Sequence, residues 1–535
     1  MEYRLNVQRA PDMVTVFTGD GPKEACANGE EWKAQGALLR TAPQKDALAV
    51  TLQEADAPIV RIRLRWRVQL PALRVLGDHW ERGYGDLEWR SIVPERPLPW
   101  YFVAWDGSAA MGCGVMTGPN AVCFWQLDED GVSLWVDTRC GAVGFLPKEP
   151  LELCRVVELP QREGETAFAA ACRLCSLLCP NPRLPAQPVY GGNNWYYAYG
   201  KSSHEEIVDD AKRIVELSPG GANRPYMVID DGWQVGHGGG YNGGPWNAGN
   251  RHFPDMAELA RAMERKGALP GIWVRPLLLR HAPERLRLPA ARMFDGNQDI
   301  MLDPSAPETL QIVSEDIQRL RAWGYRMIKH DFTTYDIWGR WGMQMGHGQL
   351  TNDGWRLGDG SRTTAQIIKA LYQTIRDAAG EDTLVIGCNT IGHLGAGLFE
   401  LQRTGDDTSG RLWERTRKMG VNTLAFRMPQ HNTFFACDAD CAGITNRVPW
   451  ELNRQWLDLL ARSGTPLFIS AAPDAMGAEQ RRAVRAALEA ASKPRPAAEP
   501  LDWMDTTAPR RWRLAEGDTH YDWTNGRGVD TMETY

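Results

Sequence analysis

The order of apolar and polar positions divides the chain into two parts with different periods. Over residues 1 to about 160, short runs alternate between apolar and polar side chains, with Gly, Pro and Asp between the runs. Such alternation is typical of half-buried strands joined by turns, and predicts a β-sandwich. The predicted strands are Met13–Phe17, Leu48–Leu52, Ile59–Val68, Trp100–Trp105, Ala121–Leu127, Ser133–Val136 and Leu151–Leu159.

From about residue 188 the pattern changes to strand-like apolar runs separated by amphipathic helical segments. The predicted strands here are Val189–Trp195, Pro225–Ile229, Leu269–Val274, Arg326–Lys329, Thr383–Gly387, Phe399–Arg403, Thr423–Met428, Phe434–Asp438 and Pro466–Ser470. Helices are predicted between them, for example Ser203–Leu217, where Ser203 and Glu206 form a capping-box pattern. This alternation favours a (β/α)8 barrel. A doubly wound open sheet is the weaker alternative, since no Gly-rich dinucleotide fingerprint follows the first strand.

These patterns predict an α/β protein with four segments. We expect an N-terminal β-sandwich over 1–163, a helical linker over 164–187, a catalytic (β/α)8 barrel over 188–475, and a C-terminal helix plus a short β extension over 476–535. The extension carries two predicted strands, Arg511–Leu514 and His520–Trp523. A homo-oligomer is compatible with this organisation.

Composition narrows the class of protein. The formal net charge of −7 argues against nucleic acid as a partner, because that requires a concentrated basic face. No apolar run is long enough for a membrane span, and the first residues lack a signal-peptide pattern, so we expect a cytoplasmic protein with no membrane partner. The 11 cysteines are scattered, which favours reduced thiols. Trp, at 22 residues, outnumbers Tyr and Phe, and its flat face suits the apolar faces of sugar rings.

Acidic residues follow four of the predicted barrel strands. They are Asp230 and Asp231, then Asp331, then Asp406 and Asp407, and finally Asp438 and Asp440. Barrel active sites lie at these carboxyl ends of the strands. One such Asp is explained by a helix cap or a turn, whereas four clusters in one ring indicate a site.

Two carboxylates in such a ring suit hydrolysis of a glycosidic bond. Lys329 lies close in sequence to Asp331 and favours its ionised form, as a nucleophile requires. Asp407 adjoins Asp406, and a like charge raises the pKa of one member of such a pair, as a proton donor requires. Arg403 tempers that effect, so its direction stays open.

Five motifs resemble those of glycoside hydrolase family 36, the bacterial α-galactosidases and their raffinose-synthase relatives, over about residues 190–475. The similar segments are Val228-Ile229-Asp230-Asp231-Gly232-Trp233, Asn297-Gln298 with Leu302-Asp303-Pro304-Ser305, Ile328-Lys329-His330-Asp331-Phe332, Gly387-Cys388 with the glycines that follow, and Thr404-Gly405-Asp406-Asp407-Thr408. Four segments differ from the family pattern. His330 replaces a Trp, Ile272–Pro276 replaces an acidic stretch, Asp295-Gly296 stands before Asn297 where an arginine is common, and Asn389–Ile391 interrupts the Gly-rich loop.

The resemblance implies a retaining α-galactosidase with Asp331 as nucleophile and Asp406 as acid/base, and no metal or other cofactor. Asp230 and Asp231 are then expected to accept hydrogen bonds from the 4- and 6-hydroxyls of the terminal sugar. Lys329 would donate to its 3- and 4-hydroxyls. Trp195, at the end of the first barrel strand, would line the pocket, with Cys388 near the 2-position. The expected substrate-binding set is completed by Trp233, Trp273, Arg275, Arg403 and Asp407.

Other readings stay open. An α-N-acetylgalactosaminidase or a transglycosylase fits the same residues. A metal-dependent barrel hydrolase would use His330, Asp331, His393, His431, Asp438 and Asp440 as ligands. A non-catalytic sugar-binding protein is the third. The roles of Asp438 and Asp440 are not fixed, and the Cys437–Cys441 stretch is taken as a turn at the pocket rim.

Overall fold

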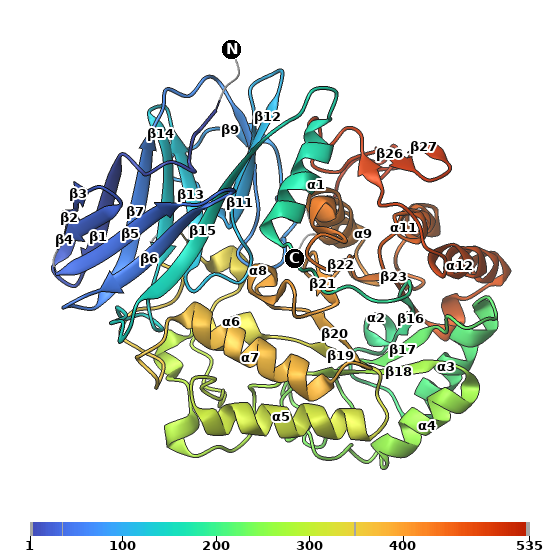
Figure 1. Cartoon of the computed structure of the whole chain (residues 1–535). Coiled ribbons are helices and arrows are strands. Elements are labelled where there is room, and N and C mark those ends of the chain that lie inside the picture. The colour runs from blue at the N-terminus through green and yellow to red at the C-terminus, as the bar shows by residue number, and fades with distance from the viewer. Residues whose placement is uncertain (1–3, 35, 347–348, 531–535) are drawn as a thin grey trace.

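The alternating N-terminal pattern forms two packed antiparallel sheets, the blue and teal part of Figure 1. A computed structural model describes residues 4–34, 36–346 and 349–530. One sheet has the strand order β10-β13-β14-β7-β1-β2, and the other β3-β4-β5-β6-β15-β12-β11-β8-β9. The strands are β1 Met13–Thr18, β2 Gly21–Glu24, β3 Cys26–Asn28, β4 Glu31–Ala34, β5 Ala37–Pro43, β6 Leu48–Glu54, β7 Ile59–Arg67, β8 Arg74–Gly77, β9 Arg90–Ser91, β10 Leu98–Pro99, β11 Tyr101–Trp105, β12 Ala110–Val115, β13 Val122–Asp128, β14 Gly131–Asp137 and β15 Leu151–Pro160.

The period of two explains which residues these sheets bury. On β7, Ile62, Leu64 and Trp66 are fully buried between the sheets. The intervening arginines of the same strand point to the opposite face. Each predicted strand is present, but β2 to β5, β8 to β10 and β12 were not predicted. The short strands β2 and β3 are mostly polar and exposed, so their sequences lack an apolar alternation.

The second part of the chain forms a curled, parallel sheet with the order β22-β21-β20-β19-β18-β17-β16-β24-β23. Its strands are β16 Tyr190–Asn193, β17 Tyr226–Ile229, β18 Leu269–Val274, β19 Met327–His330, β20 Leu384–Gly387, β21 Leu401–Arg403, β22 Ala436–Asp438, β23 Cys441–Ile444 and β24 Leu467–Ala471. The two outermost strands, β22 and β23, are separated in the chain only by Ala439 and Asp440. They are two halves of one strand that pairs first with β21 and then with β24. The sheet thereby returns on itself, and the predicted barrel is confirmed.

Helices connect the parallel strands and cover the outside of the barrel (Figure 1). They are α2 Trp195–Ala198, α3 His204–Leu217, α4 Met256–Lys266, α5 Pro307–Ala322, α6 Thr333–Trp338, α7 Thr364–Ala379, α8 Gly392–Gly395, α9 Trp413–Thr416, α10 Thr423–Arg427 and α11 Trp450–Arg462. Side-chain caps begin several of them. Ser203 accepts a hydrogen bond from the Glu206 amide at α3, and Thr363 and Gln366 form a full capping box at α7.

Two predictions for barrel elements were wrong. Trp195 does not end a strand but begins the short helix α2. The stretch Thr423–Met428 is not a strand: the π-helical segment η4 (Arg417–Asn422) runs into α10 and then into η5 (Met428–Gln430). The apolar residues Val421, Leu424, Ala425 and Met428 lie at i, i+3, i+4 and i+7, which is the period of a helix. Because the run is short and mostly apolar, the helical spacing was not recognised, and the stretch was predicted as a strand.

Two further helices and a small sheet complete the molecule. Helix α1 (Ala167–Leu178) lies between the sandwich and the barrel, and α12 (Ala478–Ala491) follows β24 (Figure 1). Strands β25 (Glu499–Pro500), β26 (Arg511–Leu514) and β27 (Gly517–His520) form the short C-terminal sheet. The predicted last strand began too late, because the turn is only Ala515-Glu516. Among the described residues, no helix is both long and apolar enough to cross a bilayer.

Candidate active site

A cavity of about 270 Å³ opens at the carboxyl ends of the barrel strands. Four of the barrel loops and one segment of the sandwich line it. The lining residues are Arg82, Tyr84, Trp195, Asp230, Asp231, Asn242, Trp273, Lys329, Asp331, Phe332, Trp341, Met343, Asp406 and Asp407. Eight of these were singled out from the sequence as site residues.

Asp331 follows β19 and is held as a carboxylate by three hydrogen bonds. Its Oδ1 accepts from the backbone N–H groups of Phe332 (2.7 Å) and Asn389 (3.0 Å), and its Oδ2 accepts from the Trp273 indole (3.1 Å). Burial opposes the charge, but the cations Arg82 and Lys329 and the indole outweigh it and lower the pKa of Asp331. The carboxylate of Asp331 therefore has a fixed orientation, and Oδ2, which accepts one hydrogen bond, has more acceptor capacity left than Oδ1, which accepts two.

Asp230 and Asp231, at the end of β17, have different surroundings. Asp230 Oδ2 pairs with the Lys329 ammonium (2.7 Å) and accepts from Asn193 (2.7 Å). Asp231 Oδ1 accepts from Gln234 (2.8 Å) and lies 3.5 Å from His237 Nδ1, whereas Asp231 Oδ2 accepts no hydrogen bond from the described residues. Asp231 therefore has acceptor capacity available for a ligand hydroxyl. Beside it, Asp230 and Lys329 form an ion pair in the absence of a ligand.

Asp406 lies between two guanidinium groups. Arg82 approaches Oδ1 at 2.7 Å, and Arg415 donates to Oδ2 at 2.8 Å. The sequence led us to expect a neighbouring like charge as the main influence on this residue. The structure instead places a cation at each oxygen of Asp406.

Cations also surround Asp407. Burial opposes its charge, yet Arg403, Arg82 and Lys329 lower its pKa to about 2. The Arg403 guanidinium lies 3.3 Å from Asp407 and 2.8 Å from Asp440. Asp407 is thus ionised at neutral pH and unsuited to donating a proton.

Four predicted substrate-binding residues do not line the cavity. Trp233 is fully buried and donates its indole N–H to the Trp273 carbonyl (2.9 Å). Arg275 lies behind Phe332, 4.1 Å from the centre of its ring, and pairs with Asp336 at 2.6 Å. Cys388 and Arg403 contact each other at 3.4 Å in the same deeper layer. These residues support the cavity wall and do not form it.

The acidic pair after β22 is also placed behind the wall. Asp440 accepts hydrogen bonds from the Thr408 amide (2.8 Å) and hydroxyl (3.1 Å) and from the Tyr196 hydroxyl. Asp438 accepts from the Asp440 amide (2.9 Å), and burial raises its pKa despite Arg403. The Cys437–Cys441 stretch is therefore not a turn at the cavity rim but the point where one strand changes partner.

The sandwich also contributes residues to the site, and these were not predicted from the sequence. The segment 78–87 leaves β8 and enters the mouth of the barrel, where Gly83 donates to the Thr404 carbonyl (2.7 Å) and accepts from the Asp406 amide (3.0 Å). It carries Arg82 and Glu81 into the site. Buried Glu81 accepts from the Gly342 amide (2.9 Å) and from the side chain of Asn389, whose own amide binds Asp331. The sequence feature that could have indicated these residues is the pair of charges in Trp80-Glu81-Arg82, which stand within an aromatic segment.

The remaining unpredicted lining residues are mostly aromatic. Trp341 stacks on Tyr335 at a ring separation of 4.6 Å, and the Arg82 guanidinium lies 5.3 Å from the Trp341 ring. Met343 is 53% exposed at the lip of the cavity. An exposed Met beside a stacked Trp provides an apolar edge where a ligand leaves the cavity.

The histidines of the metal hypothesis do not converge. His393 bonds the Val115 carbonyl (2.7 Å), and His431 bonds the Gly464 carbonyl (3.0 Å). His330 packs against Phe399 at 4.9 Å. Within residues 4–34, 36–346 and 349–530, no group of three or more His, Cys, Asp or Glu side chains is arranged to hold a metal ion. The metal-dependent reading therefore lacks a ligand set in this part of the chain.

Comparisons with known proteins identify the same architecture elsewhere. No protein-family model matches the sequence. The α-galactosidase of Thermus thermophilus, solved in complex with p-nitrophenyl α-D-galactopyranoside, matches over 95% of this chain and 99% of its own, with 17% identity and a TM-score of 0.61. A family 36 α-galactosidase of Geobacillus stearothermophilus matches over 90% of this chain and 75% of its own, with 15% identity and a TM-score of 0.59. The α-galactosidase of Lactobacillus brevis matches with 11% identity over 90% and 72%, at a TM-score of 0.57. The resemblance seen in the motifs thus extends to the fold.

Proposed function

We propose that this chain is a retaining glycoside hydrolase of the α-galactosidase type. The observation that carries the proposal is the meeting of Asp331 and Asp406 in one small cavity, with Asp230, Asp231 and Lys329 beside them. Two carboxylates facing one sugar site are the machinery of glycoside hydrolysis. The fold shared with α-galactosidases supports the choice of substrate class.

In the first step Asp331 Oδ2 attacks the anomeric carbon, and the bond from that carbon to the leaving oxygen breaks. The lowered pKa of Asp331 keeps it ionised for this role. The hydrogen bonds from Phe332 and Asn389 to Oδ1 fix the plane of the carboxylate. The product is a covalent glycosyl ester on Asp331.

Asp406 gives its proton to the departing oxygen and later takes one from the water that cleaves the ester. Asp407, whose pKa is lowered by Arg403, Arg82 and Lys329, stays beside it as a carboxylate. Each oxygen of Asp406 faces a guanidinium in the structure, so Arg82 or Arg415 must release one of them when the glycosidic oxygen arrives. Arg82 is then a positioning residue for the acid/base.

The charges of the cavity favour a neutral sugar. Lys329 pairs with Asp230, and Arg82 pairs with Asp406, so the cations that line the cavity already face carboxylates. Asp231 and Asp331 retain free acceptor positions, which match the hydroxyl donors of a hexose. A substrate lacking a matching hydroxyl leaves a buried carboxylate unpaired, which is a strong basis for discrimination.

The test is hydrolysis of aryl glycosides by the purified chain and by Asp331→Ala. We expect release from an aryl α-galactoside that is resistant to a chelator and is lost in Asp331→Ala. Azide should restore turnover of an activated substrate by Asp331→Ala, with formation of a β-galactosyl azide, because a small anion occupies the space of the missing nucleophile. Asp407→Asn, a matched carboxylate change in the same loop, should not respond to azide.

The other readings have their own outcomes. Preference for an α-N-acetylgalactosaminide would change the sugar but not the mechanism. Chelator-sensitive release, or full activity of Asp331→Ala, would contradict the proposal. Saturable sugar binding with no turnover of any member of an α- and β-glycoside panel would instead favour a sugar-binding protein.

A further inference from the structure

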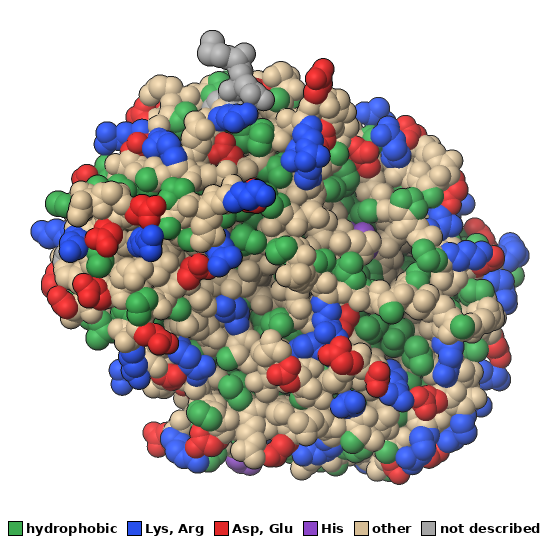
Figure 2. Space-filling model, in the orientation of Figure 1, with side chains coloured by type: hydrophobic (Ala, Val, Ile, Leu, Met, Phe, Trp, Pro, Cys, Tyr) green, Lys and Arg blue, Asp and Glu red, His purple; other side chains and the backbone are tan. Residues whose placement is uncertain are grey.

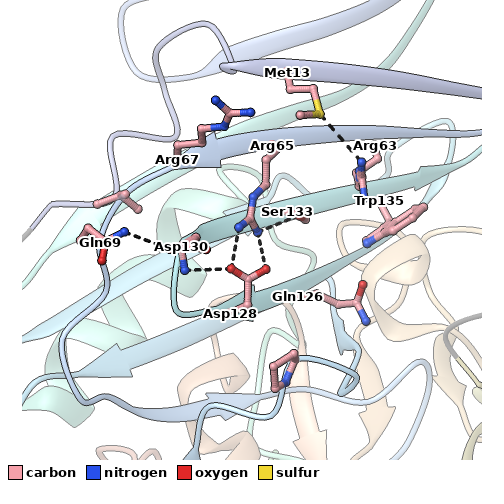
Figure 3. A pocket seen from close by; sticks show the side chains of 12 residues that line it. Met13, Arg63, Arg65, Arg67, Gln69, Gln126, Asp128, Asp130, Ser133 and Trp135 are labelled. Atoms are coloured by element: carbon pink, nitrogen blue, oxygen red, sulfur yellow. Dashed lines mark hydrogen bonds and ion pairs between the residues drawn. The ribbon is translucent and has the colours of Figure 1, made fainter. Parts of the chain in front are cut away.

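The outer face of the N-terminal sandwich carries a groove of about 720 Å³ (Figure 3). It crosses strands β1, β7, β14 and β13 of the six-stranded sheet and shares no lining residue with the barrel cavity. The lining residues are Met13, Arg63, Arg65, Arg67, Val68, Gln69, Pro94, Gln126, Asp128, Asp130, Ser133 and Trp135. Its size falls in the range of sites for small organic ligands and exceeds the need of a single ion.

The hollow has a simple origin in the sequence of the central strand. Gly131 and Ser133 of β14 lie opposite Arg67 and Arg65 of β7. Ser133, a small residue, therefore lies on the floor of the groove, and the long side chains of Arg65 and Gln126 on the neighbouring strands stand beside it. Gly131, at the start of β14 and outside the lining, has a φ of +149°, and a Cβ there would lie 2.1 Å from the Trp66 carbonyl, so the close approach of β14 to β7 requires glycine.

The arginines of β7 differ in how their charge is balanced. Arg65 is locked to Asp128 by two hydrogen bonds and also donates to Ser133 (3.2 Å). Arg63 donates only to Thr15 (3.2 Å) and to the sulfur of Met13, and its Nε has no partner. In the described part of the chain, no carboxylate lies within ion-pair distance of Arg63 or Arg67. Among the described residues, Arg63 and Arg67 thus flank the Arg65–Asp128 pair without a direct ion pair of their own, and Glu24 and Asp128 offset the charge of Arg63 only from a distance.

Ring and amide groups lie between these charges. The Arg63 guanidinium lies 5.5 Å from the centre of the Trp135 ring, which packs in parallel on Phe124. The Trp135 indole nitrogen is buried without a partner among the described residues. Gln126, half-buried on β13, also lines the hollow. The groove is therefore rich in donors that lack acceptors, next to an aromatic platform.

We propose that this groove binds an anionic saccharide, with an oxyanion held by Arg63 or Arg67 and a sugar ring resting near Trp135. Guanidinium groups bind carboxylate and sulfate with charge-assisted hydrogen bonds, and they do so best where water is partly excluded. Burial and the charge of Arg65 lower the pKa of Arg63, and an anion in the groove would relieve that cost. The glutamine amide supplies the neutral hydrogen bonds that a hydroxyl-bearing ring requires. This inference does not depend on the activity of the barrel.

The experiment is calorimetric titration of the full chain, carrying Asp331→Ala to prevent turnover, with trigalacturonate, a sulfated galactose trisaccharide and neutral galactotriose. Trigalacturonate and the sulfated sugar separate the two sources of the oxyanion. We expect saturable binding of at least one, weakened about tenfold or more by Arg63→Gln and weakened by added salt, because a charged contact is lost or screened.

Two further variants distinguish the groove from a general charge effect. Ser133→Leu fills the floor without changing any charge and should also abolish binding. Arg40→Gln removes one exposed arginine from β5 in the other sheet and should not change it. Each variant is first checked for an unchanged melting temperature. No effect of Arg63→Gln on the binding of the anionic sugars, an equal loss in Arg40→Gln, or no binding of either anionic trisaccharide would overturn the proposal.

Discussion

Arg82 connects the two domains at the level of a single side chain. It pairs with Asp406 at 2.7 Å while lying over the ring of Trp341. Under the proposed function it orients the acid/base without touching the reacting carbon. Its effect should therefore depend on how much a leaving group requires protonation.

Arg82→Met is predicted to lower kcat/KM by about 10²-fold for a poor leaving group such as phenol, and by much less for a dinitrophenol. An activated leaving group departs without a proton, so it does not need an oriented Asp406. The measurement is a series of aryl α-galactosides ranked by phenol acidity. Arg82→Lys, which keeps the charge, is the control. Equal losses across the series would show that Arg82 acts on sugar binding.

His330 is a buried residue for which the mechanism has no use. Its ring is fully buried between Tyr372 and Phe399, and neither ring nitrogen has a hydrogen-bond partner among the described residues. Burial lowers its pKa to about 3, and Asp331 offsets this only in part. The unfolded chain therefore binds a proton below about pH 6.5, whereas the folded ring remains neutral until about pH 3.

His330→Phe should remove this penalty. The variant's stability relative to the parent should rise as pH falls below about 6.5, by up to ~1.4 kcal/mol per pH unit. Urea unfolding at pH 7.5 and pH 5.5 measures the difference. His281→Asn, at an exposed position, is the control and should show no such trend. A stability difference that is the same at both pH values would contradict the prediction.

At the scale of elements, the strand that changes partner between β22 and β23 is the least regular part of the barrel. Asp440 occupies the change with a left-handed φ of +70°. Its carboxylate accepts from Thr408 and Tyr196 and pairs with buried Arg403 at 2.8 Å. One side chain thus holds the strand, the loop after β21 and the helix α2 together.

Asp440→Ala is expected to reduce the free energy of unfolding by about 3–5 kcal/mol, because it leaves Arg403 buried with only a partial partner. Asp440→Gly should cost nearly as much, since glycine relieves the left-handed φ but not the lost ion pair. Asn432→Ala is the matched control: Asn432 also has a positive φ of 59° but is exposed, and its loss should cost about 1–2 kcal/mol. Chemical denaturation gives these values. A cost for Asp440→Gly as small as the control would show that backbone strain, and not the carboxylate, dominates.

The sequence predicted regular elements well where one period dominates. Strands β18 and β26 have the predicted bounds. It failed where the apolar run is short, as at α10, and where a strand bends, as at β22 and β23, because tertiary contacts decide those cases. In the site, the acidic residues were predicted because they directly follow barrel strands, and the carboxyl ends of barrel strands form the active site. Arg82 and Glu81 were missed because Asp406 and Asn389, the site residues that they contact, lie more than 300 residues away in the sequence.

At the scale of the whole molecule, the sandwich and the barrel are joined by the segment 78–87. Asp78 pairs with Arg427 at 2.8 Å, Gly83 bonds the loop after β21, and Leu87 exchanges hydrogen bonds with Asn422. Gly85 passes close to Lys418 with a φ of +75°, where a Cβ would lie 2.6 Å from the lysine Cβ. Basic and acidic side chains alternate over the face shown in Figure 2.

Gly85→Ala is predicted to displace this segment and to reduce kcat well beyond its effect on stability. The added methyl group clashes with Lys418 and moves Arg82 relative to Asp406. Gly29→Ala is the matched control, since Gly29 has a φ of +63° but nothing within 4 Å of its position. It should cost about 1 kcal/mol of stability and leave kcat unchanged. Paired thermal melts and initial rates separate the two effects. Parallel losses in both variants would contradict the prediction.

Because segment 78–87 enters the mouth of the barrel, the order in which the two domains fold affects when the site is complete. A ribosome makes the sandwich first, and domains that emerge first generally fold first. The barrel closes only when β24, at residues 467–471, pairs with β16. Until then the cavity that holds Asp331 and Asp406 has no closed barrel around it. Under the proposed function, a nascent chain is therefore expected to stay inactive toward an α-galactoside until β24 has emerged and paired with β16. The onset of turnover would then serve as a clock for its maturation.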